Sequence, residues 1–185
     1  MLHNNELDKD FIAELLMQQN DKGDWQIKKI SNLADFIVQL DAAKRAKQAL
    51  LNKPVMDRLN KALQATSERL TLNKDSNKIG SEEKATLTAT IMAKNMSNVA
   101  INRMYYDVTV LNDKGEQLYS YPEHYQGSIA PGQAVELTTS KKLNSMLPDD
   151  QKLMNLDITK ETVKIQVTYI AFDNGEVISP KGLIE

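Results

Sequence analysis

The chain has 185 residues with 23 basic and 25 acidic side chains, so its formal net charge at pH 7 is −2. No large field of one sign exists to attract nucleic acid or anionic lipid, and nucleic acid is therefore not an expected partner. Cysteine is absent and histidine occurs only as His3 and His124, which excludes disulfides, thiolate metal sites and cysteine nucleophiles and leaves little material for histidine-dependent catalysis.

The sequence divides into two halves with different residue patterns. No glycine occurs between Gly23 and Gly80, whereas seven of the ten aromatic residues follow Gly80. This change is typical of helices followed by strands. We expect an α+β protein: an N-terminal helical region of two to three helices over 1–73, a linker over 74–83, and an antiparallel β-sandwich over 84–185.

Apolar spacing predicts three helices in the first half. The first follows Asp8 and Asp10 and ends at the polar turn 20–23. The second is capped by Ser31, and Pro54 predicts a break or sharp kink before the third. The apolar positions of the three helices are, in order, Phe11, Ile12, Leu15 and Leu16; Leu33, Phe36, Ile37, Leu40, Ala43 and Leu50; and Val55, Met56, Leu59, Leu63, Thr66 and Leu70.

The third helix has alternating spacings of three and four residues over 56–70, as in a coiled coil, but it covers only about two heptads. Packing against its own protein is the favoured interpretation, and a partner-binding helix face is the alternative.

The second half alternates apolar and polar residues with period two, as half-buried strands do. Turns at 95–98, 112–115, 130–132 and 173–175 separate the runs, and a short helix is expected at Pro148. The expected strands contain Leu87 to Ala93, Met104 to Val110, Leu118 to Tyr125, Ala134 to Ser140, Val163 to Phe172, and Val177 with Ile178. Six or seven such strands favour an antiparallel sandwich.

Residues about 83–178 resemble the FxLYD-type domains of bacterial envelope and surface lipoproteins. The features shared with that family are Lys94-Asn95-x-Ser97, the strand reaching Tyr106 and Val110, the Asn112-Asp113-Lys114-Gly115 turn, and Ile129-Ala130-Pro131-Gly132 before Val135 and Leu137. The family's aromatic-Leu-Tyr-Asp run is replaced by Val108-Thr109-Val110-Leu111-Asn112-Asp113. The resemblance implies an immunoglobulin-like sandwich, an extracytoplasmic setting and a binding or scaffolding role, without catalytic residues to transfer.

Tyr119, Tyr121 and Tyr125 form the best candidate binding surface, with His124 beside them. Residues 119 and 121 share one strand face, and Tyr125 joins them if no bulge intervenes. Exposed, these rings would stack on a sugar, a peptide or a partner protein. The alternative is that they form the inward face, since the other face of this strand offers little apolar material.

No motif for acyl transfer, nucleotide hydrolysis or dinucleotide binding occurs, and we expect no enzyme activity, metal or cofactor. The leading function is an interaction or scaffolding module that binds a protein partner in the bacterial envelope. The alternative is a small-ligand or carbohydrate receptor that uses the tyrosine-lined face.

The expected location is periplasmic or cell-surface. No apolar run is long enough to span a bilayer, so membrane association is expected only through a removed signal or lipid anchor.

Overall fold

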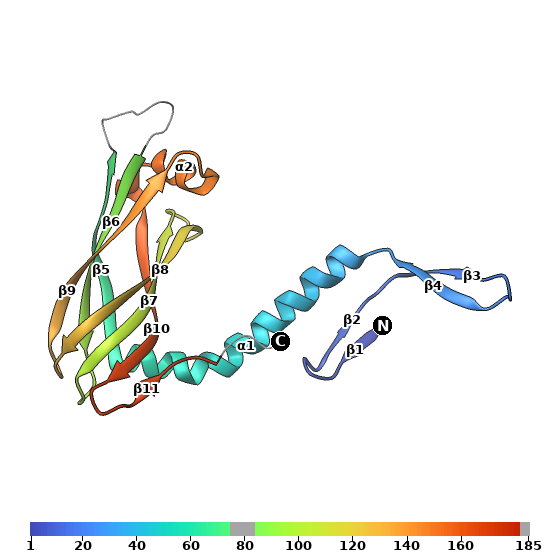
Figure 1. Cartoon of the computed structure of the whole chain (residues 1–185), viewed down its shortest axis with the longest axis horizontal. Helices are drawn as coiled ribbons and strands as arrows, with labels where there is room; N and C mark the ends of the chain where they lie inside the picture. The colour runs from blue at the N-terminus through green and yellow to red at the C-terminus, as the bar shows by residue number, and fades with distance from the viewer. Residues whose placement is uncertain (75–83, 182–185) are drawn as a thin grey trace. The chain divides into compact units, whose positions relative to one another are not determined.

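The computed structural model describes residues 1–74 and 84–181. These residues form eleven strands, two α-helices and one 3-10 helix, and all paired strands are antiparallel. The chain divides into two compact units, one of Met1–Lys53 with Lys181–Glu185 and one of Pro54–Pro180 (Figure 1).

Two hairpins and the first part of a long helix make up the first unit. Phe11, at the end of the first hairpin, is buried, and its ring meets the ring of Phe36 edge-on at 5.9 Å between centroids. The elements are β1 (Leu2–Asn4), β2 (Lys9–Phe11), β3 (Leu15–Gln19), β4 (Trp25–Ile30) and α1 (Leu33–Ala62), which continues into the second unit.

The predicted α+β fold with an N-terminal region of two to three helices is wrong: the chain is mostly β, and the residues of the first predicted helix form the end of β2 and strand β3. Residues 15–19 pair with 25–30, and the side chain of Asn20 closes the turn by accepting hydrogen bonds from the backbone N–H groups of Lys22 and Asp24, both at 2.9 Å. The polar turn therefore reverses a hairpin instead of ending a helix. A window this short matches both periods, and cross-strand pairing decides between them.

Of the break or sharp kink predicted at Pro54, the break does not occur, because α1 continues through this residue. Proline has no N–H to donate to the carbonyl of Leu50, so one helical hydrogen bond is lost there. The boundary between the two compact units falls at the same place in the chain, between Lys53 and Pro54.

The predicted third helix ends at Ala62, and β5 (Leu63–Lys74) follows at once. A β-bulge between Ser67 and Arg69 explains the error. In the pairing of β5 with β6 (Lys84–Asn95), some β5 residues stand opposite buried residues of β6. They are Leu63, Ala65, Ser67, Leu70, Leu72 and Lys74. The extra residue at the bulge gives Leu63 and Leu70 a separation of seven, which imitates a heptad.

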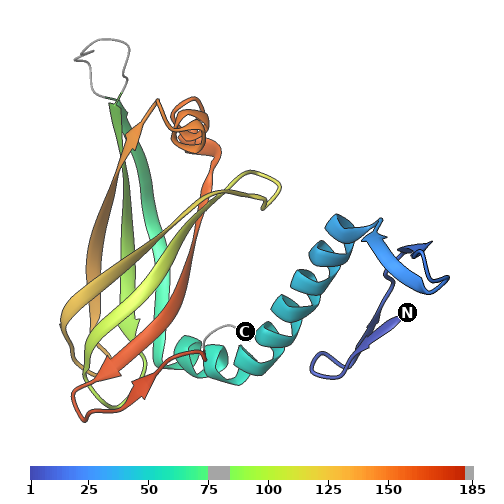
Figure 2. The same cartoon turned by 45° about the vertical axis from the view of Figure 1, so that its right-hand side comes forward.

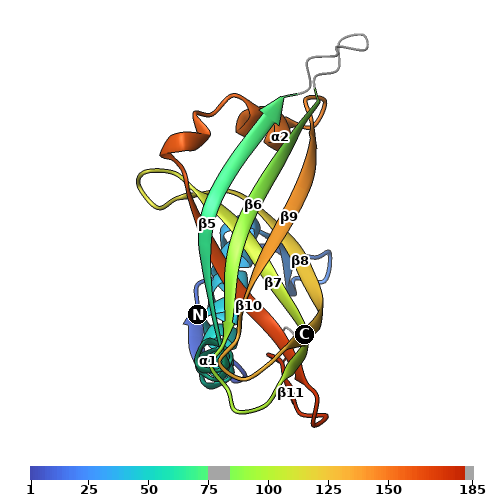
Figure 3. The same ribbon diagram turned by 90° about the vertical axis from the view of Figure 1, so that its left-hand side faces the viewer.

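Two antiparallel sheets form the second unit, as Figure 3 shows. One has the strand order β5-β6-β9 and the other β11-β10-β7-β8. The remaining elements are β6 (Lys84–Asn95), β7 (Ile101–Leu111), β8 (Gln117–Ile129), β9 (Ala134–Asn144), α2 (Pro148–Met154), a 3-10 helix (Ile158–Lys160), β10 (Thr162–Phe172) and β11 (Val177–Ile178). The antiparallel β-rich character expected of this half is confirmed.

The core lies between the two sheets. Alternate residues of β6 and β7 are buried, and both strands contribute to one apolar cluster. These residues are Ala85, Leu87, Ala89, Ile91 and Ala93 of β6 and Met104, Tyr106, Val108 and Val110 of β7. The short helix α2, expected at Pro148, lies beside the end of β9 (Figure 2).

The side chain of Asn95 joins the two sheets at one end of the core. Its amide donates to the carbonyls of Val99 at 2.9 Å and Ile129 at 2.8 Å, and its oxygen accepts from the backbone N–H and the hydroxyl of Ser97. Asn95 is completely buried. Since Asn95 ends β6 and Ile129 ends β8, this one side chain connects a strand of each sheet through fully paired polar atoms.

The predicted linker, 74–83, lies outside the described residues except for Lys74, the last residue of β5. Within the described ranges, no helix combines the length and the apolar character needed to cross a bilayer.

We predict that Asn95→Ala lowers the free energy of unfolding by about 2 to 6 kcal/mol, because the buried carbonyl of Ile129 loses this donor and the backbone N–H of Ser97 loses its acceptor. Urea denaturation followed by circular dichroism measures this loss. Asn98→Ala is the control, since Asn98 is exposed in the same turn. A loss for Asn95→Ala no larger than that of the control would contradict the role assigned to this side chain.

Candidate functional site

The tyrosine row predicted from the sequence lies on β8 and faces the core. Tyr119, Tyr121 and Tyr125 stand opposite Val110, Val108 and Met104 of β7, which are the buried residues of that strand. No bulge separates the three tyrosines, so they share one face as expected. That face is the inward one: Tyr121 is only 3% exposed, and Tyr119 and Tyr125 are half-buried against the core.

Tyr119 holds α2 against the sheet. Its hydroxyl donates to the Asp150 carboxylate at 2.9 Å, and the other oxygen of that carboxylate accepts from the backbone N–H of Asn144 at 3.0 Å. Burial, together with this hydrogen bond to Asp150, raises the pKa of Tyr119 to about 12. The contact is structural, and it accounts for the buried carboxylate of α2.

His124 lies on the opposite face of β8, where it is exposed. It stands across from Tyr105 of β7, which stands across from Tyr169 of β10. The ring centroids of Tyr105 and His124 are 6.1 Å apart, and those of Tyr105 and Tyr169 are 5.0 Å apart. An aromatic row therefore crosses the outer face of the four-stranded sheet.

A bulge in β10 turns Tyr169 to this face. Val167 pairs with Tyr106 and Tyr169 pairs with Tyr105, so Thr168 is an extra residue in the ladder. Val167 before the bulge and Ile170 after it are both buried. Strict alternation would place Tyr169 on the same side as Val167, and the bulge reverses this.

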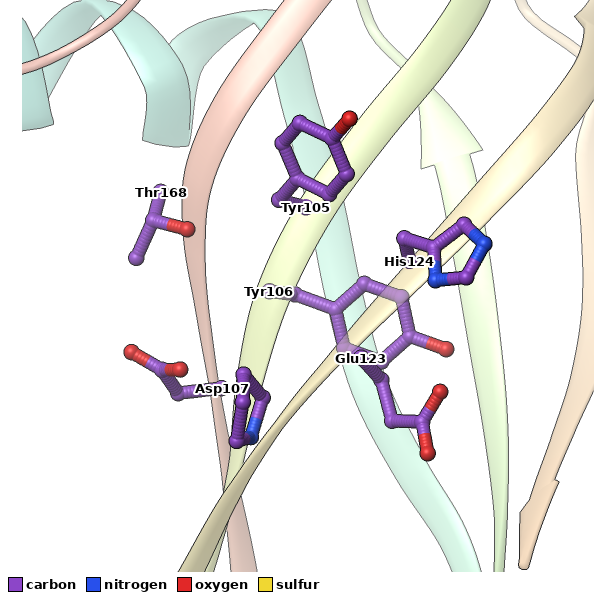
Figure 4. Close-up of a pocket in the computed structure, with 7 residues that line it drawn as sticks. Tyr105, Tyr106, Asp107, Glu123, His124 and Thr168 are labelled. Carbon is purple, nitrogen blue, oxygen red and sulfur yellow. The ribbon is translucent and has the colours of Figure 1, made fainter.

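A pocket of about 260 Å³ lies beside the row (Figure 4). Its lining residues are Tyr105, Tyr106, Asp107, Pro122, Glu123, His124 and Thr168. Tyr105 is 40% exposed, whereas its neighbour Tyr106 is 4% exposed and points to the core. We call Tyr105, Asp107, His124 and Tyr169 the outer-face site.

The Asp107 carboxyl gives the outer-face site its charge. Asp107 is half-buried, and burial raises the pKa of its carboxyl above the ordinary value. Its cross-strand neighbours, Gln166 and Pro122, carry no charge. Among the described residues it makes no ion pair and no side-chain hydrogen bond.

Glu123 also lines the pocket, but it stands opposite Tyr106 on the inward-facing side of β8, and its side chain extends away from Asp107 (Figure 4). Burial, and to a smaller extent the negative charges of Glu123 and Tyr121, raise the pKa of Tyr106 to about 12. The Asp107 carboxylate is therefore the acidic group of the outer-face site.

Sequence reasoning identified His124 but missed Tyr105, Asp107 and Tyr169. An aromatic residue among the polar positions of β7, opposite in phase to Met104, was a visible signal for Tyr105. Tyr169 gave no comparable signal, because a bulge leaves no mark in the alternation before pairing is known.

Within residues 1–74 and 84–181, no group of three or more histidine, aspartate and glutamate side chains is arranged to hold a metal ion. Asp149 and Asp150 are adjacent in sequence but make different contacts. Asp150 is buried and accepts a hydrogen bond from the Tyr119 hydroxyl, whereas Asp149 is exposed, with a carboxylate oxygen 3.3 Å from the Lys152 Nζ.

Comparisons with known proteins assign no function to the outer-face site. No family model and no curated protein matches the chain. Solved structures similar to it include a Northeast Structural Genomics Consortium target (15% identity, 69% of this chain and 89% of that chain, TM-score 0.36). A protein from Archaeoglobus fulgidus is 15% identical over 64% of this chain and 93% of that chain, with a TM-score of 0.33. The Salmonella enterica trimeric lipoprotein SadB is 9% identical over 80% of each chain, with a TM-score of 0.31.

We predict that Tyr119→Phe lowers the free energy of unfolding by about 1 to 3 kcal/mol at pH 7, because the buried Asp150 carboxylate loses a donor. The pKa of Tyr119 is higher in the folded protein than in the unfolded chain, so its stabilisation is complete below pH 10 and is lost as pH rises through about 12. Urea denaturation of both proteins at pH 7, 9 and 11 measures the difference, which we expect to shrink at the highest pH.

Tyr105→Phe is the matched control for this pH series. The Tyr105 ring is exposed on the outer face and its hydroxyl makes no hydrogen bond with a described residue, so we expect little change in stability at pH 7. Equal effects of the two substitutions would argue against the Tyr119–Asp150 contact.

Proposed function

We propose that this protein is a non-catalytic interaction module of the bacterial envelope, and that it binds a protein partner through the outer-face site. The observation that carries the proposal is the aromatic row beside an unpaired carboxylate on an open sheet face. Exposed tyrosines, desolvated on contact and bordered by a polar group, are the side chains that dominate protein interfaces.

The site favours docking on the face of the sheet over strand addition at its edge. β8 is an edge strand, and Pro122 within it has no N–H to offer an added strand. The neighbouring outward pair, Thr109 and Ser120, is already joined by a hydrogen bond of 3.0 Å between hydroxyls. The surface offered to a partner is thus a set of side chains already ordered by the sheet.

The envelope setting rests on the resemblance of residues 83–178 to FxLYD-type domains, which stays a prediction. A periplasmic or cell-surface location, with a lipid anchor in the precursor, belongs to the same proposal. The alternative function, a small-ligand or carbohydrate receptor built on Tyr119, Tyr121 and Tyr125, is not favoured, because these rings pack toward the core.

Site-specific photo-cross-linking tests the proposal. With a benzophenone amino acid in place of Tyr105, we expect the full-length protein, in the cells that produce it, to cross-link to a discrete protein partner that mass spectrometry identifies. Thr138, exposed on the other sheet, is the control position. Equal cross-linking from both positions, or a product only from Thr138, would contradict the assignment of the outer face.

A further inference from the structure

We propose that the pocket of the outer-face site binds a guanidinium group, supplied by an arginine side chain of the partner and held between the Asp107 carboxylate and the Tyr105 ring. This inference rests on the proposed function, because it assumes that a protein supplies the arginine. It goes further by assigning the chemistry of the group that enters.

Charge is the first reason. Asp107 is half-buried without a basic partner among the described residues. The basic residues on this face stand in other rows of the sheet: Lys164 opposite Thr109, and Arg103 opposite Ala171. Because a partly desolvated carboxylate gains most from a cation that reaches it directly, the pocket favours a positively charged ligand.

The raised pKa of Asp107 is consistent with a pocket that favours a cation, since its cause is burial without a compensating charge. An arriving cation would favour the ionised form and lower that pKa again.

The rings beside Asp107 are the second reason. A tyrosine face attracts a cation through its π electrons, and Tyr105 is 40% exposed. Tyr169 supports this ring from one side at 5.0 Å, and His124 stands 6.1 Å away on the other. The planar guanidinium group can stack on an aromatic ring while its fork of N–H groups binds a carboxylate, which an ammonium group cannot do.

Size is the third reason. At about 260 Å³ and open to solvent, the pocket lies below the range of roughly 300–1,000 Å³ in which proteins enclose free small molecules. It has room for the end of one side chain presented by a larger partner. This favours an arginine anchored in a protein over a free metabolite.

The experiment is an NMR titration of the full-length, ¹⁵N-labelled protein with N-acetyl-arginine methylamide. We expect amide shifts centred on residues 105–107, 123–124 and 168. The citrulline analogue, which has the same shape without the charge, should cause shifts at least about tenfold smaller at equal concentration. This comparison uses the unaltered protein and does not depend on how a variant folds.

Two variants sharpen the test. Asp107→Asn should weaken arginine binding by about tenfold and leave the dispersion of the spectrum unchanged. Asp113→Asn, at an exposed position in the turn between β7 and β8, should leave binding as it was. Equal binding of arginine and citrulline, or equal weakening by the two substitutions, would overturn the inference.

Other probes separate the remaining sources of binding. The lysine analogue should cause smaller shifts than arginine. A panel of soluble oligosaccharides that shifts the same amides while arginine does not would overturn the inference in favour of a sugar site. A partner cross-linked at Tyr105 without any response to arginine would refute the guanidinium and leave the proposed function standing. An arginine response without a cross-linked partner would refute that function instead.

Discussion

The buried Asn95 side chain is the constraint on which the second unit depends. It ends β6 in one sheet and donates to the last residue of β8 in the other, and every hydrogen-bonding atom of its amide has a partner. A neighbouring backbone bond, from the N–H of Met96 to the carbonyl of Ala62, ties the end of α1 to the same corner. Because a buried amide is tolerated only when it is fully paired, this end of the core has little freedom to rearrange.

The outer-face site follows from that rigid end. With β7 and β8 held in register, burial of Met104, Tyr106 and Val108 sends the residues between them outward. The bulge at Thr168 then brings Tyr169 to the same side. The aromatic row is thus a consequence of three strands aligned by their buried faces, and its rings need no loop to position them. A surface of this kind presents side chains at low entropic cost to a partner.

The sequence predicts an element correctly when interactions between residues close together in the chain determine it, and fails when pairing with a separate segment does. The strands at β6 and β7 and the turn at Gly115 are local features, and alternation or turn chemistry predicts them. The first and third predicted helices failed, because their apolar spacing matched a helix while the residues form strands paired with distant or neighbouring segments. At the site, His124 was found, and Tyr105 was visible as an aromatic on a polar face.

The sequence by itself determined the absence of disulfide and cysteine chemistry, the alternating strands of the second half and the common face of Tyr119 and Tyr121, which Tyr125 joins because no bulge intervenes. Only the tertiary structure decided that this common face is buried, since alternation defines two faces without saying which one meets the other sheet. The bulges at Glu68 and Thr168 were likewise decided by pairing with β6 and β7. A bulge shifts which side chains face the core, and its position is set by the partner strand, which lies outside any local window of the sequence.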